Sequence, residues 1–125
     1  MPHLVLNGPF VPTRMATLVG TEVHRWRRAV IKTENVWTRR DGQAALVEGV
    51  VVEFSRPLHP VAVVASRGED TAIRLWSRAP VERTEPVQRW LCLIAVELQK
   101  AGAGGVLTTN IPEDLWSDLE LRVAT

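Results

Sequence analysis

Residues 31–53 read IKTENVWTRRDGQAALVEGVVVE, and this stretch decides the fold. Two strand-like runs flank Asp41-Gly42, and this dipeptide between such runs is the strongest short-range signal for a β-hairpin. The sequence therefore predicts strands near 30–40 and 43–54, joined by a type I′ turn with positive φ at both central residues. Folding the chain at this turn predicts three cross-strand pairs: Trp37 with Leu46, Thr33 with Val50, and Ile31 with Val52.

The period of two in a strand places these pairs on one face of the sheet. Glu48 falls on the same face, opposite Asn35. A carboxylate among apolar neighbours has to be paired, become neutral or line a cavity, unless the sheet extends past its cover there. The opposite face is mixed in character, and its expected residues are Lys32, Val36, Val47 and Val51.

The chain downstream of the hairpin predicts more strands and one long helix. PVAVVAS and TAIRLWS, joined by RGED, form a second hairpin, so four antiparallel strands follow in meander order. Pro86 after Thr84-Glu85 opens a helix, and the glycines at 102, 104 and 105 end it near residue 101. HLVLNG, VLTT and LELRVA read as extended segments, and Asn110 is the expected cap of a short helix through Trp116.

Residues 14–30 fit two interpretations. Apolar residues recur at helical spacing, at Met15, Leu18, Val19, Val23, Trp26 and Val30. Gly20 and several β-branched residues favour a strand instead. We favour the N-terminal helix and leave the strand open.

These elements predict one α+β domain over residues 1–125. We expect a curved antiparallel sheet of about four to six strands, with the helix at 86–101 packed on its concave face. Net charge is +1, and the single cysteine, Cys92, excludes an internal disulfide and a cysteine-rich metal site. The longest apolar run, WLCLIAV at 90–96, is too short to cross a membrane. We therefore expect a cytoplasmic protein with no membrane association and no signal peptide.

The chain holds five tryptophans and no tyrosine, which suits an apolar cavity or interface. We therefore predict a non-enzymatic binding module with no cofactor. Its ligand would be small and apolar or amphipathic and would lie between helix and sheet. The expected lining is Trp37, Glu48, Trp76 and Trp90.

Two other function classes remain open. A nucleic-acid-binding module would use Arg25, Arg27, Arg28, Arg39 and Arg40, with Trp26 as a stacking platform. Near-zero net charge and the absence of any nucleic-acid-binding signature make this partner the weaker interpretation. A small enzyme would use His59 or Glu48 as general base, but the sequence carries no nucleophile, metal-ligand or dinucleotide motif.

The long helix also predicts self-association. Every residue from Trp90 to Val96 is apolar, and a run of that length passes around the whole helix. A helix lying on one sheet needs an apolar stripe on one side only. We therefore expect a homo-oligomer, with a second copy covering the side of the helix that the sheet leaves open.

Overall fold

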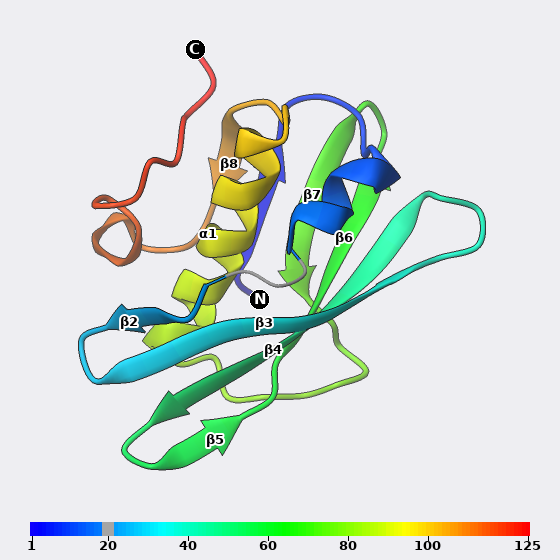
Figure 1. The fold of residues 1–125 in the computed structure, drawn as a ribbon. Coiled ribbons are helices and arrows are strands. Elements are labelled where there is room, and N and C mark those ends of the chain that lie inside the picture. The colour runs from blue at the N-terminus through cyan, green and yellow to red at the C-terminus, as the bar shows by residue number, and fades with distance from the viewer. Residues whose placement is uncertain (19–21) are drawn as a thin grey trace.

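The computed structural model describes residues 1–18 and 22–125 and shows an α+β fold. In the described part, eight antiparallel strands form one curled sheet in the order β2-β3-β4-β6-β7-β1-β8, with β5 beside β4 (Figure 1). The strands are β1 (His3–Leu6), β2 (His24–Trp26), β3 (Ala29–Thr38), β4 (Ala44–Glu53), β5 (Arg56–Leu58), β6 (Val61–Arg67), β7 (Asp70–Leu75) and β8 (Val106–Thr109). The helices are α1 (Glu85–Lys100) and the 3-10 helices η1 (Pro12–Leu18) and η2 (Glu113–Leu115).

The predicted meander is present as β3-β4-β6-β7, and both predicted hairpins form. The sheet is larger than the predicted four to six strands. β1 and β8 extend it beyond β7, and β2 and β5 add short strands at the other end. These additional strands are only three or four residues long, which is too short for a clear alternating pattern in the sequence.

Asp41-Gly42 lies in the turn between β3 and β4, as predicted. The backbone N–H of Gly42 donates to the Arg39 carbonyl, and the N–H of Arg39 donates to the Ala44 carbonyl. Gly42 has a φ of 72°, whereas Asp41 does not have positive φ. The predicted type I′ turn is therefore wrong. A wider turn closes the hairpin, with Gly42 in the left-handed region that suits glycine.

A β-bulge in β3, between Thr33 and Asn35, changes the register that the sequence predicts. The pair Trp37–Leu46 is confirmed, but Thr33 lies opposite Gly49 rather than Val50. A bulge adds one residue to one strand, so side chains on its two sides exchange faces. For this reason Thr33 does not share the face of Trp37.

The predicted helix over 14–30 is wrong. η1 covers its first part, but β2 and the start of β3 form an antiparallel hairpin in its second part. Arg27, in the turn of this hairpin, has a φ of 55°. Val19, which belonged to the helical pattern, and Gly20 and Thr21, which opposed it, lie outside the described residues.

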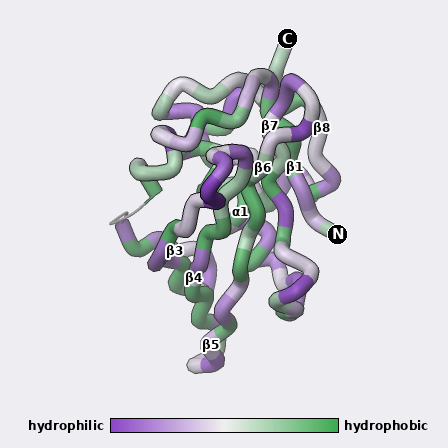
Figure 2. Tube along the Cα trace, turned by 90° about the vertical axis from the view of Figure 1, so that its right-hand side faces the viewer, coloured by the Kyte–Doolittle hydropathy of each residue, from purple (hydrophilic) through white to green (hydrophobic). Residues whose placement is uncertain are grey.

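The sheet curls around α1, and η1 and the C-terminal segment complete the cover of the helix (Figure 1). Thr84 caps α1 by accepting a hydrogen bond from the Val87 N–H at 3.4 Å, in line with the predicted start. All residues from Trp90 to Val96 are buried within one chain. Figure 2 shows hydrophobic residues along α1 and the strands around it. The inference of a second copy from this helix is therefore wrong, because the fold covers the helix by itself.

The C-terminal segment differs from its prediction in two places. Asn110 does not cap a helix; its amide oxygen accepts from the His3 N–H, and its NH₂ donates to the Met1 carbonyl. LELRVA forms only an isolated parallel bridge between Val123 and Val106 instead of a strand. Leu115 and Leu121 nevertheless join the core that surrounds α1.

Candidate functional site

The sheet has one face toward α1 and one face away from it, here called the outer face. Two adjacent rows of side chains cross the outer face, as the strand registers show. The first row contains Trp37, Leu46, Val63 and Arg74. The second row contains Asn35, Glu48, Val61 and Trp76, because the Trp76 N–H continues the pairing by donating to the Val61 carbonyl. Four strands thus bring two tryptophans, one arginine and one glutamate together.

These rows border a groove of about 400 Å³, here called the Trp37–Trp76 groove. Its lining is predominantly apolar, and it consists of Trp37, Thr38, Arg39, Ala44, Ala45, Leu46, Val63, Arg74 and Trp76. Trp37 is 62% exposed, which is unusual for so large an apolar side chain. Trp76 is half-buried, and Val63 is nearly fully buried beneath its neighbours.

Glu48 is paired, which is one of the outcomes that the sequence predicted for it. The Trp37 indole N–H donates a hydrogen bond to the Glu48 carboxylate across the two rows. Trp37 and Glu48 lie on the paired strands β3 and β4. The hydrogen bond between them therefore restrains the indole ring at the rim of the groove. Glu48 does not line the groove itself but positions a side chain that does.

Trp90 lies on the other side of the sheet, in the core. Its indole N–H donates to the Thr33 hydroxyl at 3.0 Å, and its ring lies against Gly49. A Cβ added at Gly49 would come within 2.6 Å of that ring. The side chains of α1 fill the space between helix and sheet, where we expected the ligand. Of the four predicted lining residues, the structure gathers Trp37, Glu48 and Trp76 and separates Trp90.

The charges of the groove are not balanced. The Arg39 guanidinium binds Asp41 through two contacts of 2.8 and 2.7 Å, and this hydrogen bonding lowers the pKa of the Asp41 carboxyl. Arg74 forms no ion pair with any carboxylate in the described part of the chain. We had not predicted Arg74 as a site residue. The signal was present, since Arg74 and Trp76 are two positions apart in one strand and share a face.

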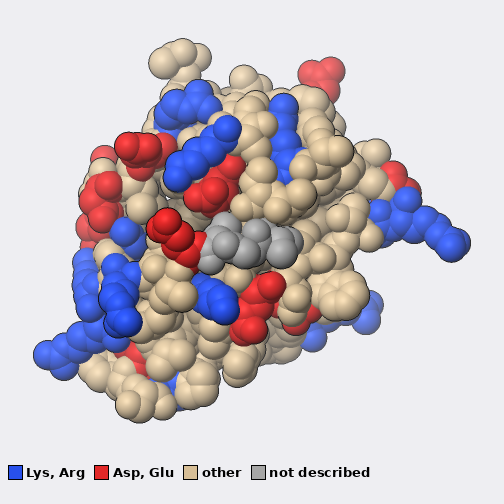
Figure 3. Space-filling model, viewed as in Figure 1, with Lys and Arg blue, Asp and Glu red and all other residues tan. Residues whose placement is uncertain are grey.

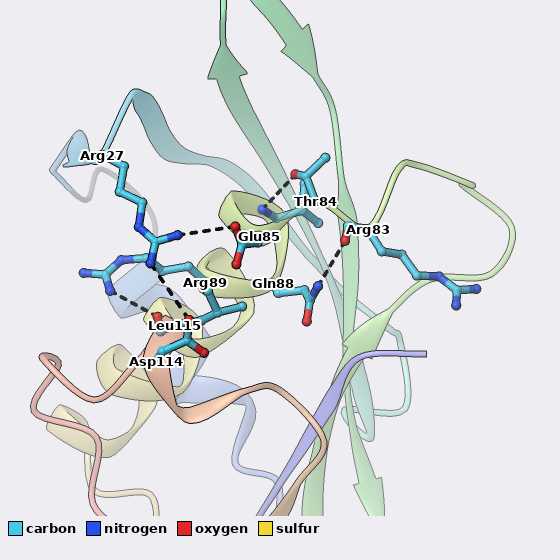
Figure 4. A network of polar contacts seen from close by, with 9 residues as sticks. Arg27, Arg83, Thr84, Glu85, Gln88, Arg89, Asp114 and Leu115 are labelled. Atoms are coloured by element: carbon cyan, nitrogen blue, oxygen red, sulfur yellow. Dashed lines mark hydrogen bonds and ion pairs between the residues drawn. The ribbon is translucent and has the colours of Figure 1, made fainter.

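Trp26, Arg27 and Arg28 of the basic stretch at 25–28 make contacts within the protein. Arg27 lies 4.1 Å and Arg89 lies 4.9 Å from the centre of the Trp26 ring. Arg27 pairs with Glu85 at 3.3 Å and with Asp114 at 4.0 Å, as Figure 4 shows. Trp26 is half-buried. Arginine–indole contacts of this kind are stabilising on their own, and they use the surface that a base would stack on.

The five arginines of the nucleic-acid interpretation do not form one patch. Arg25 lies in β2 and Arg27 and Arg28 lie in the turn before β3, whereas Arg39 and Arg40 follow the other end of β3. A strand of ten residues spans about 33 Å. Figure 3 shows the basic side chains of this face in several separate groups, with acidic and other side chains among them.

The structure places the candidates for catalysis apart from any enclosed site. His59 is exposed in the loop between β5 and β6, and Glu48 is engaged by Trp37. Cys92 is fully buried, and this burial raises the pKa of its thiol to about 12, so the thiolate form is suppressed. Among residues 1–18 and 22–125, no group of three His, Cys, Asp or Glu side chains is placed to hold a metal ion.

No protein-family model, no curated protein and no solved structure matches this chain. None of the helices in the described residues is long and apolar enough to cross a membrane. The cytoplasmic location stays a prediction.

Proposed function

We propose that the protein is a non-enzymatic binding module that holds a small apolar or amphipathic ligand in the Trp37–Trp76 groove. The observation that carries this proposal is an apolar hollow between two tryptophans on the outer face of the sheet. An antiparallel sheet with one covered face is expected to carry polar residues on the other. Here the outward side chains of β4 are Ala44, Leu46, Glu48, Val50 and Val52, of which only one is polar.

The groove has the size and the stiffness that a ligand site needs. Its volume of about 400 Å³ falls in the range of small-molecule pockets. Its floor, Leu46 and Val63, belongs to paired strands in the middle of the sheet. Glu48 restrains the exposed indole of Trp37. Such prior ordering lowers the entropy that a ligand must give up on binding, and it therefore favours affinity.

The uncharged fluorescent probe N-phenyl-1-naphthylamine tests this proposal. Its emission should rise on binding to the wild-type protein, and Trp76→Ala should weaken binding about tenfold, because an aromatic contact contributes about 0.5–1.5 kcal/mol beyond its buried area. Phe54→Ala is the matched control, since Phe54 is 69% exposed in the β4–β5 turn, outside the groove. Absence of binding, or equal losses in the two variants, would contradict the proposal.

A second copy of the chain is the competing cover for the same apolar face. The homo-oligomer remains a prediction, and it now rests on the outer face rather than on α1. Sedimentation at micromolar concentration measures the mass of the wild type and of Leu46→Arg, which places a charge in the floor of the groove. A dimer that Leu46→Arg dissociates would assign the face to self-association and remove the small-ligand proposal. A monomer of 13.9 kDa would leave the groove open for a ligand.

A further inference from the structure

The Trp37–Trp76 groove contains one cation that the described residues leave without a counter-charge. Arg39 is neutralised by Asp41 at 2.7 Å within its own turn. Glu48, the carboxylate in the adjoining row, accepts the hydrogen bond from the Trp37 indole. Arg74 remains, and the described residues offer it neither an ion pair nor a side-chain hydrogen bond to a carboxylate.

The neighbours of Arg74 on the sheet make it suited to an anion in this groove. In the first row it stands between Val63 on one strand and His3 on the other. Trp76, two positions further along the chain and just beyond the end of β7, continues the same face, because its N–H donates to the Val61 carbonyl. Arg74 itself is exposed, but a ligand lying on the apolar floor would exclude water from one side of the guanidinium. A charge contact in such a partly dry setting is stronger than one in open water.

We propose that the ligand of this groove is an anion with a flat apolar body, and that Arg74 binds its carboxylate, sulfonate or phosphate group. The apolar body lies over Leu46 and Val63, between the indoles of Trp37 and Trp76. The guanidinium of Arg74 offers paired N–H donors in a plane, which match the oxygens of such a group. This inference rests on the proposed function and adds the charge class of the ligand.

Two probes with the same aromatic body separate this inference from the proposed function. 8-Anilinonaphthalene-1-sulfonate carries a sulfonate that N-phenyl-1-naphthylamine lacks. We expect the wild type to bind the anionic probe about tenfold more tightly, the order of effect that a hydrogen bond to a charged group has. Arg74→Gln should remove that preference, so that the variant binds the anionic and the neutral probe with equal affinity. Unfolding curves of each variant establish that the fold is retained.

Arg39→Gln is the matched control, because Arg39 also lines the groove but is held by Asp41. It should lower the affinity for the anionic probe much less than Arg74→Gln does. Equal affinity for the two probes in the wild type would overturn the inference and leave the binding function standing. An equal loss in Arg39→Gln and Arg74→Gln would also overturn it, because the preference would then be a general effect of positive charge. Failure of both probes to bind would instead remove the proposed function.

Discussion

Trp90 and Trp37 occupy opposite faces of the same sheet, and each donates its indole N–H to a side chain of that sheet. Trp90 is 1% exposed and donates to Thr33, a neutral hydroxyl on β3. Trp37 is 62% exposed and donates to Glu48, a carboxylate on β4. The two acceptors differ because burying a carboxylate would be costly, whereas a hydroxyl satisfies a buried N–H without adding charge.

The difference between the two faces separates stability from binding. On the helix side, Gly49 leaves the space that the Trp90 ring fills, so the fold depends on a close fit there. On the outer side, Trp37 borders a hollow that no other part of the described chain fills. We therefore expect substitutions at Trp90 to change the free energy of unfolding. Substitutions at Trp37 should change binding instead.

The largest expected effect is the loss of stability on removal of the Trp90 indole, compared with removal of the Trp37 indole. Trp90→Ala should lower the free energy of unfolding by about 3–5 kcal/mol, because it empties a large volume in the core and leaves a cavity. Trp37→Ala should change it by no more than about 0.5 kcal/mol, as is usual for surface positions. Urea denaturation measures both values. Similar losses in the two variants would break the distinction between the faces.

A smaller effect is expected when a methyl group is added beneath the buried indole. Gly49→Ala places a Cβ 2.6 Å from the Trp90 ring, and such overpacking usually costs about 1–3 kcal/mol. In a Trp90→Leu background the same substitution should cost less, since the ring that it meets is gone. Denaturation of the four proteins in this double-mutant cycle measures the coupling. If the two substitutions change the free energy of unfolding additively, glycine at position 49 is not needed to make room for the Trp90 ring.

The smallest expected effect is on the pH dependence of stability, and it comes from Arg89 on α1. This residue is buried and donates to Asp118 at 2.7 and 3.0 Å. This hydrogen bonding lowers the pKa of Asp118 in the folded protein. A depressed folded pKa stabilises the protein above the unfolded value of about 3.9, and this contribution is lost as pH falls through the folded pKa.

Asp118→Asn should therefore flatten the acid limb of the unfolding free energy plotted against pH. Urea denaturation at a series of pH values below about 5 measures this slope. Arg89→Met should flatten the limb in the same way, because it removes the partner that shifts the pKa. A slope equal to that of the wild type in both variants would show that the pair makes no pH-dependent contribution.

The comparison between the faces also shows where sequence reasoning succeeds. The hairpin at Asp41-Gly42 and the second hairpin through Gly68 depend on local turn residues and on alternation, and both are present. The helix from Glu85 to Lys100 depends on its cap and on the glycines that follow. Trp37 and Trp76 were grouped because tryptophan suits an apolar site, and the structure brings them to one groove.

The wrong predictions share a physical cause, because each concerns a feature that is decided by contacts between residues far apart in the sequence. The cover of α1 comes from η1 and from residues near the C-terminus, such as Leu115 and Leu121. The region at 24–30 folds as a hairpin because β3 continues into the sheet, which overrides its helical spacing. Arg89 of α1, far along the sequence, contacts Trp26. None of these contacts has a local signal.

The sequence by itself determined which residues alternate, where the chain turns and where the long helix begins and ends, since these depend on neighbours within a few positions. Only the tertiary structure decided which face of the sheet meets α1. Both faces of β4 are largely apolar. Its period of two therefore divides the residues into two sets, but it does not indicate which set is buried in the core. The bulge in β3 and the space at Gly49 select the set of Val47 and Val51 for the core. Leu46 and Glu48 are thereby left on the outer face with Trp37, Arg74 and Trp76.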